Sequence, residues 1–325
     1  MDEHAIDWAA LARLRANFLE GSAGRADYWR TPTDLASYDE TFGCRIGWKW
    51  DYVLSELVRR AWSPPPGPAL DWGCGSGTAG RSLLAHFGPK SVAGLALWDR
   101  SPLAMQFAAK KARKTFPGLA VECGPPPLAS PATMLISHVL TELSPAQTTD
   151  LLAQAARATA VIWVEPGTQI AGRMLVAARE RLREGFQLVA PCPHQGPCGM
   201  SAPEAERYWC HHFAPSPPEA FMSRKWSRFA QIAGVDLRSL PLAFLVLDKR
   251  PAPPLPPGTV RIIGRPRIQK AYAQATSCEP CGIHERRVMK RTLPQEFRAM
   301  KRGDFAPLQA WQLDGDEVTA AQPVT

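Results

Sequence analysis

Cysteine residues in two separate parts of this chain offer soft metal ligands. Cys192, Cys198 and Cys210 are spaced C-x5-C-x11-C, and Cys278 lies far downstream. Three nearby thiolates with a distant fourth suit a tetrahedral zinc ion or an iron–sulfur cluster. The first segment, "APCPHQGPC", contains prolines that restrict the loop before it binds anything. From spacing alone, small buried thiols in a proline-rich loop are an open alternative.

The downstream stretch "CEPC" makes the identity of the fourth ligand ambiguous. Cys281 follows Cys278 at the C-x-x-C spacing, which also suits a redox pair, and His194 is a possible substitute ligand in the first loop. The chain shows neither a secretory signal nor an apolar run long enough to span a bilayer. We therefore expect a cytoplasmic protein without membrane attachment, in which cysteines serve as ligands, core residues or redox thiols rather than disulfides.

A glycine cluster in "LDWGCGSG" predicts a nucleotide-binding turn. Gly73, Gly75 and Gly77 follow an apolar strand and precede a helix, so the backbone can turn sharply and present unpaired amides to a ligand. Asp99, at the end of the next strand, suits the hydroxyls of a ribose. A dinucleotide and S-adenosylmethionine both fit this pattern. With Asp71 before the turn, the pattern favours S-adenosylmethionine, because acidic-x-G-x-G-x-G is typical of class I methyltransferases.

Polar side chains follow the next strands at the edge where such sheets bind ligands. Ser137, His138 and Glu142 come after one strand and Glu165 ends the following one, so they are candidates to face the cofactor or the acceptor. His138 is equally compatible with a structural role, and Glu165 with capping a helix. The chain has no N/D-P-P-Y/F tetrad, and its "GPPP" follows the wrong strand. The sequence therefore identifies no catalytic residue.

The elements that position these residues predict an α/β fold with an appendage. Residues 1–65 have helical periodicity, and in 66–250 apolar strands alternate with amphipathic helices, which predicts a doubly wound, mainly parallel sheet. The cysteine loop, 187–213, interrupts that alternation. A proline-rich connection leads into a basic, β-rich extension over 251–305. Residues 306–325 are acidic, and we expect them to form a mobile tail.

The charge is concentrated in the extension. The formal net charge is +8, yet residues 249–302 contain 13 Lys or Arg against 3 Glu. Basic side chains with aromatic neighbours such as Trp226 and Phe229 suit phosphate contacts and base stacking, although a solvated charged face is the alternative. The candidate RNA-binding residues are Arg224, Lys225, Arg228, Arg265, Arg267, Lys270, Arg286 and Arg287.

Taken together, "LDWGCGSGT", "SHVLTEL", "VEPGT", "APCPHQGPC", "WCHHF", "GRPR" and "RGDF" resemble the mitochondrial small-ribosomal-subunit methyltransferase-like assembly factors and their bacterial relatives. This Rsm22-like resemblance covers roughly residues 28 to 305. It implies a class I methyltransferase fold and a 4Fe–4S cluster held by four cysteines, here Cys192, Cys198, Cys210 and Cys278. The longer gap before Cys210, the extra histidine in "WCHHF" and the rival Cys281 depart from the family pattern.

The sequence thus predicts a monomeric protein that binds S-adenosylmethionine and a structural iron–sulfur cluster, with zinc as the alternative metal. Its expected partner is small-subunit ribosomal RNA or the small ribosomal subunit. Three functions remain open at this stage. They are an RNA methyltransferase, an assembly factor that binds RNA without transferring a methyl group, and a zinc-stabilised methyltransferase of small molecules.

Overall fold

The computed structural model describes residues 6–20, 27–126 and 130–324. Parts of the predicted helical region, residues 1–5 and 21–26, lie outside the described residues, as does Pro127 of the "GPPP" stretch. The chain forms two compact units. Unit 1 comprises residues 1–165 and 214–240, and unit 2 comprises residues 166–213 and 241–325. The structure thus assigns the cysteine loop to the same unit as the extension, rather than to the domain predicted over 66–250.

Unit 1 contains a parallel sheet whose strands end at one edge. Its strands are β1 (Pro68–Trp72), β2 (Gly94–Trp98), β3 (Val121–Cys123), β4 (Thr133–Ser137) and β5 (Ala160–Pro166). They run in the order β3-β2-β1-β4-β5, and every pairing is parallel. Trp72 pairs with Trp98 and with Ile136, so the ends of β1, β2 and β4 are aligned. The residues that follow these strands therefore share one edge of the sheet.

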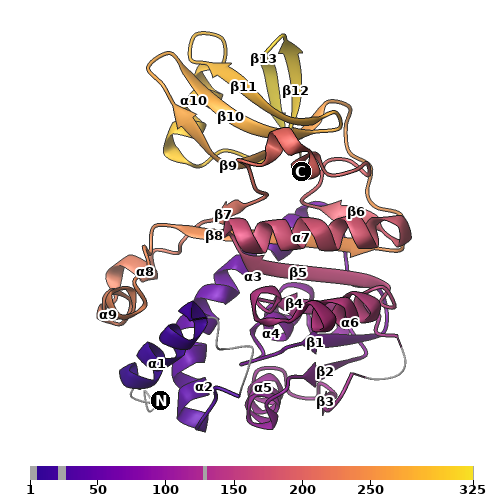
Figure 1. Ribbon diagram of the computed structural model, residues 1–325, viewed down its shortest axis with the longest axis vertical. Coiled ribbons are helices and arrows are strands. Elements are labelled where there is room, and N and C mark those ends of the chain that lie inside the picture. The colour runs from indigo at the N-terminus through magenta and orange to yellow at the C-terminus, as the bar shows by residue number, and fades with distance from the viewer. Residues whose placement is uncertain (1–5, 21–26, 127–129, 325) are drawn as a thin grey trace. The chain divides into compact units, whose positions relative to one another are not determined.

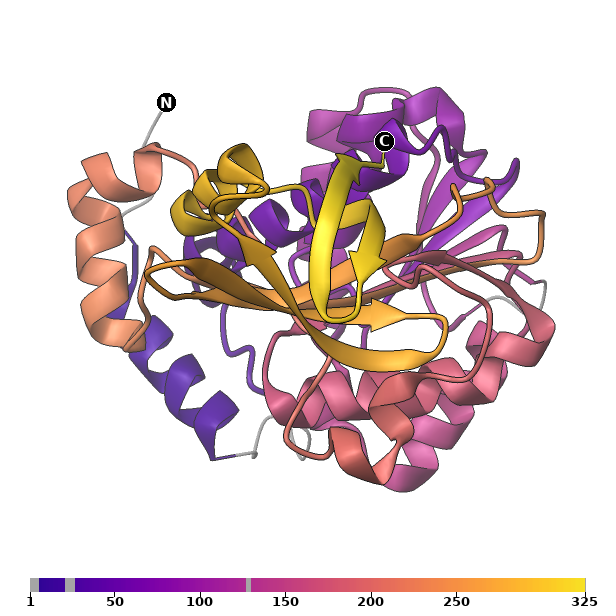
Figure 2. The same cartoon turned by 90° about the horizontal axis from the view of Figure 1, so that it is seen from above.

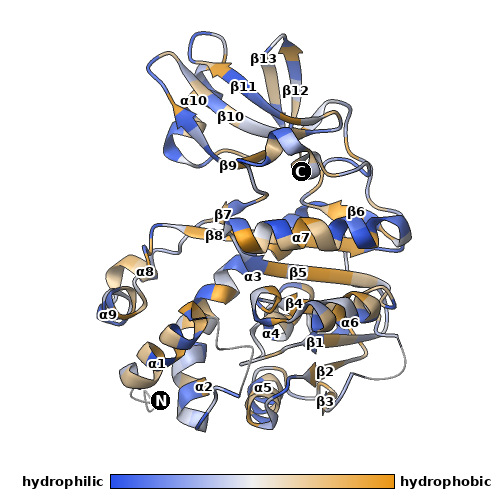
Figure 3. Ribbon diagram, in the orientation of Figure 1, coloured by the Kyte–Doolittle hydropathy of each residue, from blue (hydrophilic) through white to orange (hydrophobic). Residues whose placement is uncertain are grey.

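The helices of unit 1 are α1 (Trp8–Leu19), α2 (Pro32–Tyr38), α3 (Cys44–Arg59), α4 (Thr78–Phe87), α5 (Pro102–Thr115), α6 (Pro145–Ala155), α8 (Glu219–Met222) and α9 (Arg224–Ala233). Helices α4, α5 and α6 lie beside this sheet, and residues of α1, α2, α5 and α9 form a separate apolar cluster (Figure 1). Side chains of β4 and β5 are almost all buried, and β5 is hydrophobic along most of its length (Figure 3). Such continuous apolar runs are what a parallel strand covered on both faces requires.

Unit 2 combines one long helix and a small antiparallel group with a closed barrel. Its elements are α7 (Gln169–Leu182), β6 (Gln187–Ala190), β7 (His212–Ala214), β8 (Leu240–Asp248), β9 (Thr259–Ile268), β10 (Tyr272–Glu279), β11 (Gly282–Met289), α10 (Pro294–Arg302), β12 (Leu308–Asp314) and β13 (Glu317–Pro323). Both β6 and β7 pair with β8. The barrel closes in the order β10-β11-β13-β12-β9, and Figure 2 shows its strands in orange and yellow.

The C-terminal residues do not form the mobile tail that their acidity suggested. Strands β12 and β13 pair with each other and complete the barrel. Trp311 is 6 % exposed and Val318 is fully buried, and both belong to the barrel core with Phe297 and Met300 of α10. The acids gather instead at the hairpin turn, where Gly315 has a φ of +55°. Alternating apolar residues on both sides of an Asp-Gly turn were the overlooked hairpin signal.

Candidate functional sites

The glycine turn lies between β1 and α4 and requires glycine at its ends. Gly73, Gly75 and Gly77 all have positive φ, between +50° and +80°. A Cβ atom on Gly73 would lie 2.7 Å from Cγ1 of Val139, and one on Gly77 would lie 2.8 Å from Cβ of Ala108. The backbone thus turns in a space that excludes side chains, and α4 begins at Thr78. A helix start reached through such a turn presents its amides to an anionic or polar ligand.

Asp99 is joined directly to this turn. Its Oδ2 accepts a hydrogen bond from the backbone N–H of Gly75 at 2.9 Å, and its Oδ1 accepts one from Ser101 at 2.9 Å. Burial raises the pKa of Asp99, although the two backbone donors oppose the shift. Each carboxylate oxygen has a second lone pair for a ligand hydroxyl. The structure therefore brings together the turn and the acid that the sequence paired.

Asp71 has a different position from the one expected of a ligand contact. Its side chain is fully buried, and Oδ2 accepts a hydrogen bond from the N–H of Gly80 in α4 at 2.9 Å. Burial raises the pKa of Asp71 to about 7, even though the bond from Gly80 lowers it. The side chain reaches α4 instead of the surface of the turn. We therefore expect Asp71 to position the turn rather than to contact a cofactor.

The residues after β4 are engaged by α3. Trp50 donates from Nε1 to Oγ of Ser137 at 3.0 Å, and Nζ of Lys49 lies 3.1 Å from Nε2 of His138. His138 has a φ of +57°, a backbone conformation that is uncommon outside glycine. Burial, together with the neighbouring Lys49, holds the pKa of His138 well below its ordinary value. The imidazole is therefore neutral, and its Nε2 can accept a hydrogen bond from the lysine when the ring proton is on Nδ1.

Lys49 and the two neighbouring glutamates complete this edge. Burial lowers the pKa of Lys49 to about 7 and raises that of Glu142 to about 7. Oε1 of Glu165 accepts hydrogen bonds from the N–H groups of Val139 and Leu140, so it holds the turn after β4 and does not cap the next helix. Lys49 was not among the residues predicted from the sequence. The pattern that could have identified it is a lysine between two tryptophans on the apolar side of a helix.

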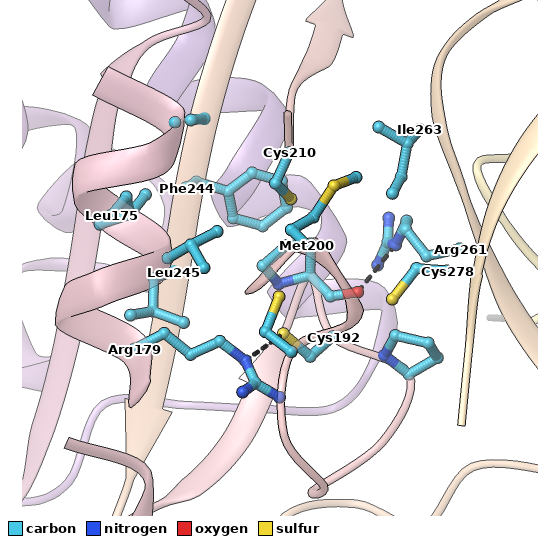
Figure 4. A pocket seen from close by; sticks show the side chains of 16 residues that line it. Leu175, Arg179, Cys192, Met200, Cys210, Phe244, Leu245, Arg261, Ile263 and Cys278 are labelled. Carbon is cyan, nitrogen blue, oxygen red and sulfur yellow. Dashed lines mark hydrogen bonds between the residues drawn. The ribbon is translucent and has the colours of Figure 1, made fainter. Parts of the chain in front are cut away.

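Four cysteines of unit 2 line one cavity, as Figure 4 shows. Cys192 and Cys198 come from the loop after β6, Cys210 precedes β7, and Cys278 lies in β10. The remaining wall is mostly apolar, formed by Leu175, Val176, Met200, Phe244, Leu245 and Ile263. Loop and barrel segments that are far apart in the sequence therefore meet at these thiols.

Two arginines add positive charge to this cavity. Arg179 in α7 donates from Nε to Sγ of Cys192 at 3.2 Å, and the fully buried Arg261 in β9 donates to the carbonyl oxygen of Pro191 at 2.9 Å. Burial raises the pKa of Cys198 to about 11, and the nearby Cys192 adds to that shift. Burial also raises the pKa of Cys210 and of Cys278. These raised pKa values favour the protonated thiol at Cys198, Cys210 and Cys278, so a bound metal would have to displace those protons.

The spacing of these thiols bears on the size of the group that they suit. A tetrahedral zinc ion with Zn–S bonds of about 2.3 Å needs its sulfur ligands roughly 3.8 Å apart. Within the described residues, the only three or more metal-ligating atoms that lie within 4.8 Å of one another belong to Glu279, Cys281 and His284. The four cavity thiols are soft donors that suit either a zinc ion or an iron–sulfur cluster.

The two rival ligands have different environments. Cys281 is exposed and does not line the cavity; its Sγ lies 3.2 Å from Nε2 of His284. The adjacent Glu279 is held by Arg286 through two hydrogen bonds of 2.8 Å. His194 is close to the cavity thiols, with Nε2 3.6 Å from Sγ of Cys278. The structure therefore brings Cys278, and not Cys281, to the cysteine loop.

The candidate RNA-binding residues divide between the units. In α9 of unit 1, Lys225 pairs with Glu40 at 3.6 Å and Arg228 lies over the ring of Trp8. Trp226 and Phe229 are buried in the core, so the prediction that they stack on bases is wrong. Helical periodicity explains the error, because these apolar residues form the inward face of α9.

In unit 2 the basic residues differ in exposure. Arg265, Arg267, Lys270 and Arg287 are exposed, and Arg224 in unit 1 is exposed as well. Arg286 is bound to Glu279 and its side chain is 11 % exposed, so it is a poor phosphate contact. Within the described residues, no helix has the length and hydropathy needed to cross a bilayer. The cytoplasmic location and the monomeric state stay predictions.

Unit 1 is an α/β unit with a glycine turn linked to an acid at the edge of its parallel sheet. Unit 2 has a thiol-lined cavity and a small closed barrel. The chain belongs to the family described as mitochondrial small ribosomal subunit Rsm22, whose model matches residues 109–307. No curated protein matches the sequence.

Two solved structures that match this chain at low sequence identity are methyltransferases. Magnesium protoporphyrin IX methyltransferase from Synechocystis PCC 6803, solved with S-adenosylmethionine, is 14 % identical with a TM-score of 0.39, over 76 % of this chain and 100 % of that one. A SAM-dependent methyltransferase from Leishmania major is 13 % identical with a TM-score of 0.39, over 74 % and 83 %. Matches at this level say nothing about activity.

Proposed function

We propose that this protein binds S-adenosylmethionine in unit 1 and acts on small-subunit ribosomal RNA or on its assembly. The observation that carries the cofactor proposal is the hydrogen bond between Asp99 and the Gly75 amide, which joins the ribose-binding acid to the turn. The family description supports the ribosomal partner. When bound, the cofactor supplies an electrophilic methyl group. The turn would orient it, and Asp99 would accept hydrogen bonds from its hydroxyls.

Unit 2 is proposed to hold a 4Fe–4S cluster through Cys192, Cys198, Cys210 and Cys278. Four soft donors line one cavity, and Arg179 and Arg261 would offset the negative charge of thiolates. A cluster there would crosslink the loop after β6 to strand β10. Its role in this proposal is therefore structural.

One observation favours an assembly factor that does not transfer methyl groups. Ser137 and His138, the polar residues at the end of β4, are both engaged by α3 through Trp50 and Lys49. Acceptor activation at that edge would need one of these bonds to break. The alternative function is thus RNA binding with a retained cofactor site.

Methyl transfer to isolated small ribosomal subunits separates the two functions. The protein would be mixed with subunits from a deletion strain and with radiolabelled S-adenosylmethionine, after calorimetry has shown that the cofactor binds. Label in the ribosomal RNA is expected for the methyltransferase. Binding without label would leave the assembly factor, and absence of cofactor binding would refute the proposed site.

Metal analysis after anaerobic purification tests the second site. About four irons per chain and a broad visible absorbance are expected. Stoichiometric zinc in a colourless protein would refute the cluster. Cys278→Ser should lose the iron while Cys281→Ser keeps it, because only Cys278 lines the cavity.

A further inference from the structure

The barrel of unit 2 has the connectivity of an oligonucleotide-binding barrel. Strands β9, β10 and β11 are followed by α10 and then by β12 and β13. The barrel closes in the order β10-β11-β13-β12-β9, with β11 and β13 parallel and the other pairs antiparallel. In barrels of this kind the outer face of the second and third strands often binds single-stranded nucleic acid. Fold alone does not establish a ligand, so the side chains on the outside of the barrel have to indicate one.

A cavity of about 260 Å³ lies against β9 and β10, the first and second strands of the barrel. Ala273 and Ala275 of β10 point into the barrel core, so the alternate residues Gln274 and Thr276 face outward into the cavity. Arg265 and Arg267 of β9 line it as well. The opening coincides with an irregularity in the pairing of β9 and β10 between Gln274 and Thr276. The irregularity thus lies beside residues that line the cavity.

Three aromatic or basic residues of the cysteine loop complete the wall of the cavity. They are Arg207, Tyr208 and His211. One of them, His211, fits there because residue 264 is a glycine. Gly264 has a φ of +67°, and a Cβ atom there would lie 2.8 Å from Nε2 of His211. The N–H of Gly264 also donates to the carbonyl oxygen of His211 at 3.0 Å. Any larger residue at position 264 would displace the imidazole from the cavity wall.

The rings beside the cavity are held in fixed orientations. His211 stacks on Trp209 with centroids 4.4 Å apart and an interplanar angle of 18°, and Trp209 donates from Nε1 to the carbonyl oxygen of Gly167 at 3.0 Å. Arg207 lies over the ring of Tyr208, with its guanidinium carbon 4.7 Å from the centroid. Rings that are already ordered lose little entropy when a base stacks on them.

Glu285 organises the polar side of the cavity without cancelling its charge. It accepts hydrogen bonds from the hydroxyl of Tyr208 at 2.9 Å, from Arg267 at 2.5 Å and from Gln274 at 2.5 Å. One carboxylate thus positions three wall residues. Three of the nine residues that line the cavity are arginines, so its wall is rich in basic groups that suit an anion.

We propose that this cavity binds one unpaired nucleotide of an RNA strand, which deepens the proposed function and rests on its RNA partner. The arginines contact phosphates, the rings of His211 and Tyr208 stack against the base or sugar, and Thr276 hydrogen-bonds to polar atoms of the nucleotide. A bulky duplex cannot place a base edge here, whereas an unpaired nucleotide can. An acidic peptide would satisfy the arginines and leave the ring platform without a planar partner.

Binding of the full-length protein to RNA tests this site. Fluorescence anisotropy would compare a labelled single-stranded RNA, the same sequence as a duplex, and a glutamate-rich peptide as competitor. The double variant Arg265→Gln/Arg267→Gln is expected to weaken single-strand binding about ten- to one-hundred-fold. The matched control Lys301→Gln/Arg302→Gln, which removes two charges from α10 outside the cavity, should change it less than about three-fold.

A second variant tests the stacking independently of charge. His211→Ala should weaken the single strand about ten-fold while leaving the weaker duplex binding unchanged. Thermal unfolding and iron content of each variant would show that the fold is intact.

Four results would overturn the proposal. Equal losses in cavity and control variants would reduce the effect to net charge. Preference for duplex, or stronger binding of the peptide, would assign the cavity to another ligand. If the wild-type protein binds RNA and every cavity variant binds equally well, the cavity is not the site and the proposed function stands. If the wild type binds no RNA, the RNA partner itself fails.

Discussion

The two units surround their candidate sites with opposite kinds of charged side chain. In unit 1, buried or half-buried carboxyl groups lie along the edge of the sheet, those of Asp71, Asp99, Glu142 and Glu165. Backbone N–H groups donate hydrogen bonds to three of them, Asp71, Asp99 and Glu165. In unit 2, soft side chains converge on a cavity with two buried arginines. The first environment suits ligand hydroxyls and a cationic centre, whereas the second suits an anionic, thiolate-bound group. Each unit therefore offers what the other lacks, and variants can separate the sites.

Loss of one cavity thiol should produce the largest and most one-sided effect. Cys210→Ser is expected to remove nearly all iron, because a four-thiolate site with a missing ligand no longer matches the cluster. Affinity for S-adenosylmethionine should stay within about two-fold, since Asp99 and the turn belong to unit 1. Iron analysis and calorimetry on the same preparation measure both. Retained iron in Cys210→Ser, or lost iron in the control Cys281→Ser, would break the assignment.

Removal of a large core side chain should affect unit 1 without affecting the thiols. Trp226→Ala is expected to lower the free energy of unfolding by about 3–5 kcal/mol, because Trp226 is 2 % exposed within the helical cluster. Urea denaturation measures the change. The exposed Phe221 supplies the control, and Phe221→Ala should cost less than about 0.5 kcal/mol. A comparable cost for both would mean that α9 does not pack as described.

Neutralising the acid at the turn should weaken only the cofactor site. Asp99→Asn is expected to reduce affinity for S-adenosylmethionine about ten- to one-hundred-fold, because the amide gains donors where the ribose hydroxyls need acceptors. Calorimetry measures the affinity, and iron content should not change. The exposed Asp150 in α6 is the matched control. If Asp150→Asn weakens binding as much, long-range charge and not a ribose contact is responsible.

The smallest effect is expected in the pH dependence of unit 1 stability. Burial raises the pKa of Asp71 to about 7, above its unfolded value of about 3.9. The favourable contribution is therefore complete below about pH 4 and is lost as the pH rises towards 7. Asp71→Asn removes this titration and keeps an oxygen for the Gly80 amide. Melting temperatures between pH 4 and 8 should fall less steeply in the variant, by a few degrees across the range. Parallel profiles would contradict the prediction.

Local patterns determined the parts of this protein that depend on neighbouring residues. The glycine turn followed from a strand, three glycines and a helix, because positive φ values and free helix amides are properties of a short segment. The alternation of apolar strands and amphipathic helices indicated the parallel sheet, because each of these patterns is likewise a property of a short segment. The acidic composition after residue 305 led to the wrong prediction of a mobile tail. It hid the alternation of apolar and polar residues that places Trp311 and Val318 in the barrel core.

Only the tertiary structure decided which distant residues meet. Cys278 and Cys281 are three residues apart, yet only Cys278 lines the cavity with the cysteine loop. Cys278 lies within β10, whereas Cys281 follows the end of that strand at Glu279. Lys49 lies against His138 because α3 packs at the end of β4. Spacing along the chain set the candidate ligands. Strand register and helix packing, which depend on contacts remote in sequence, chose among them.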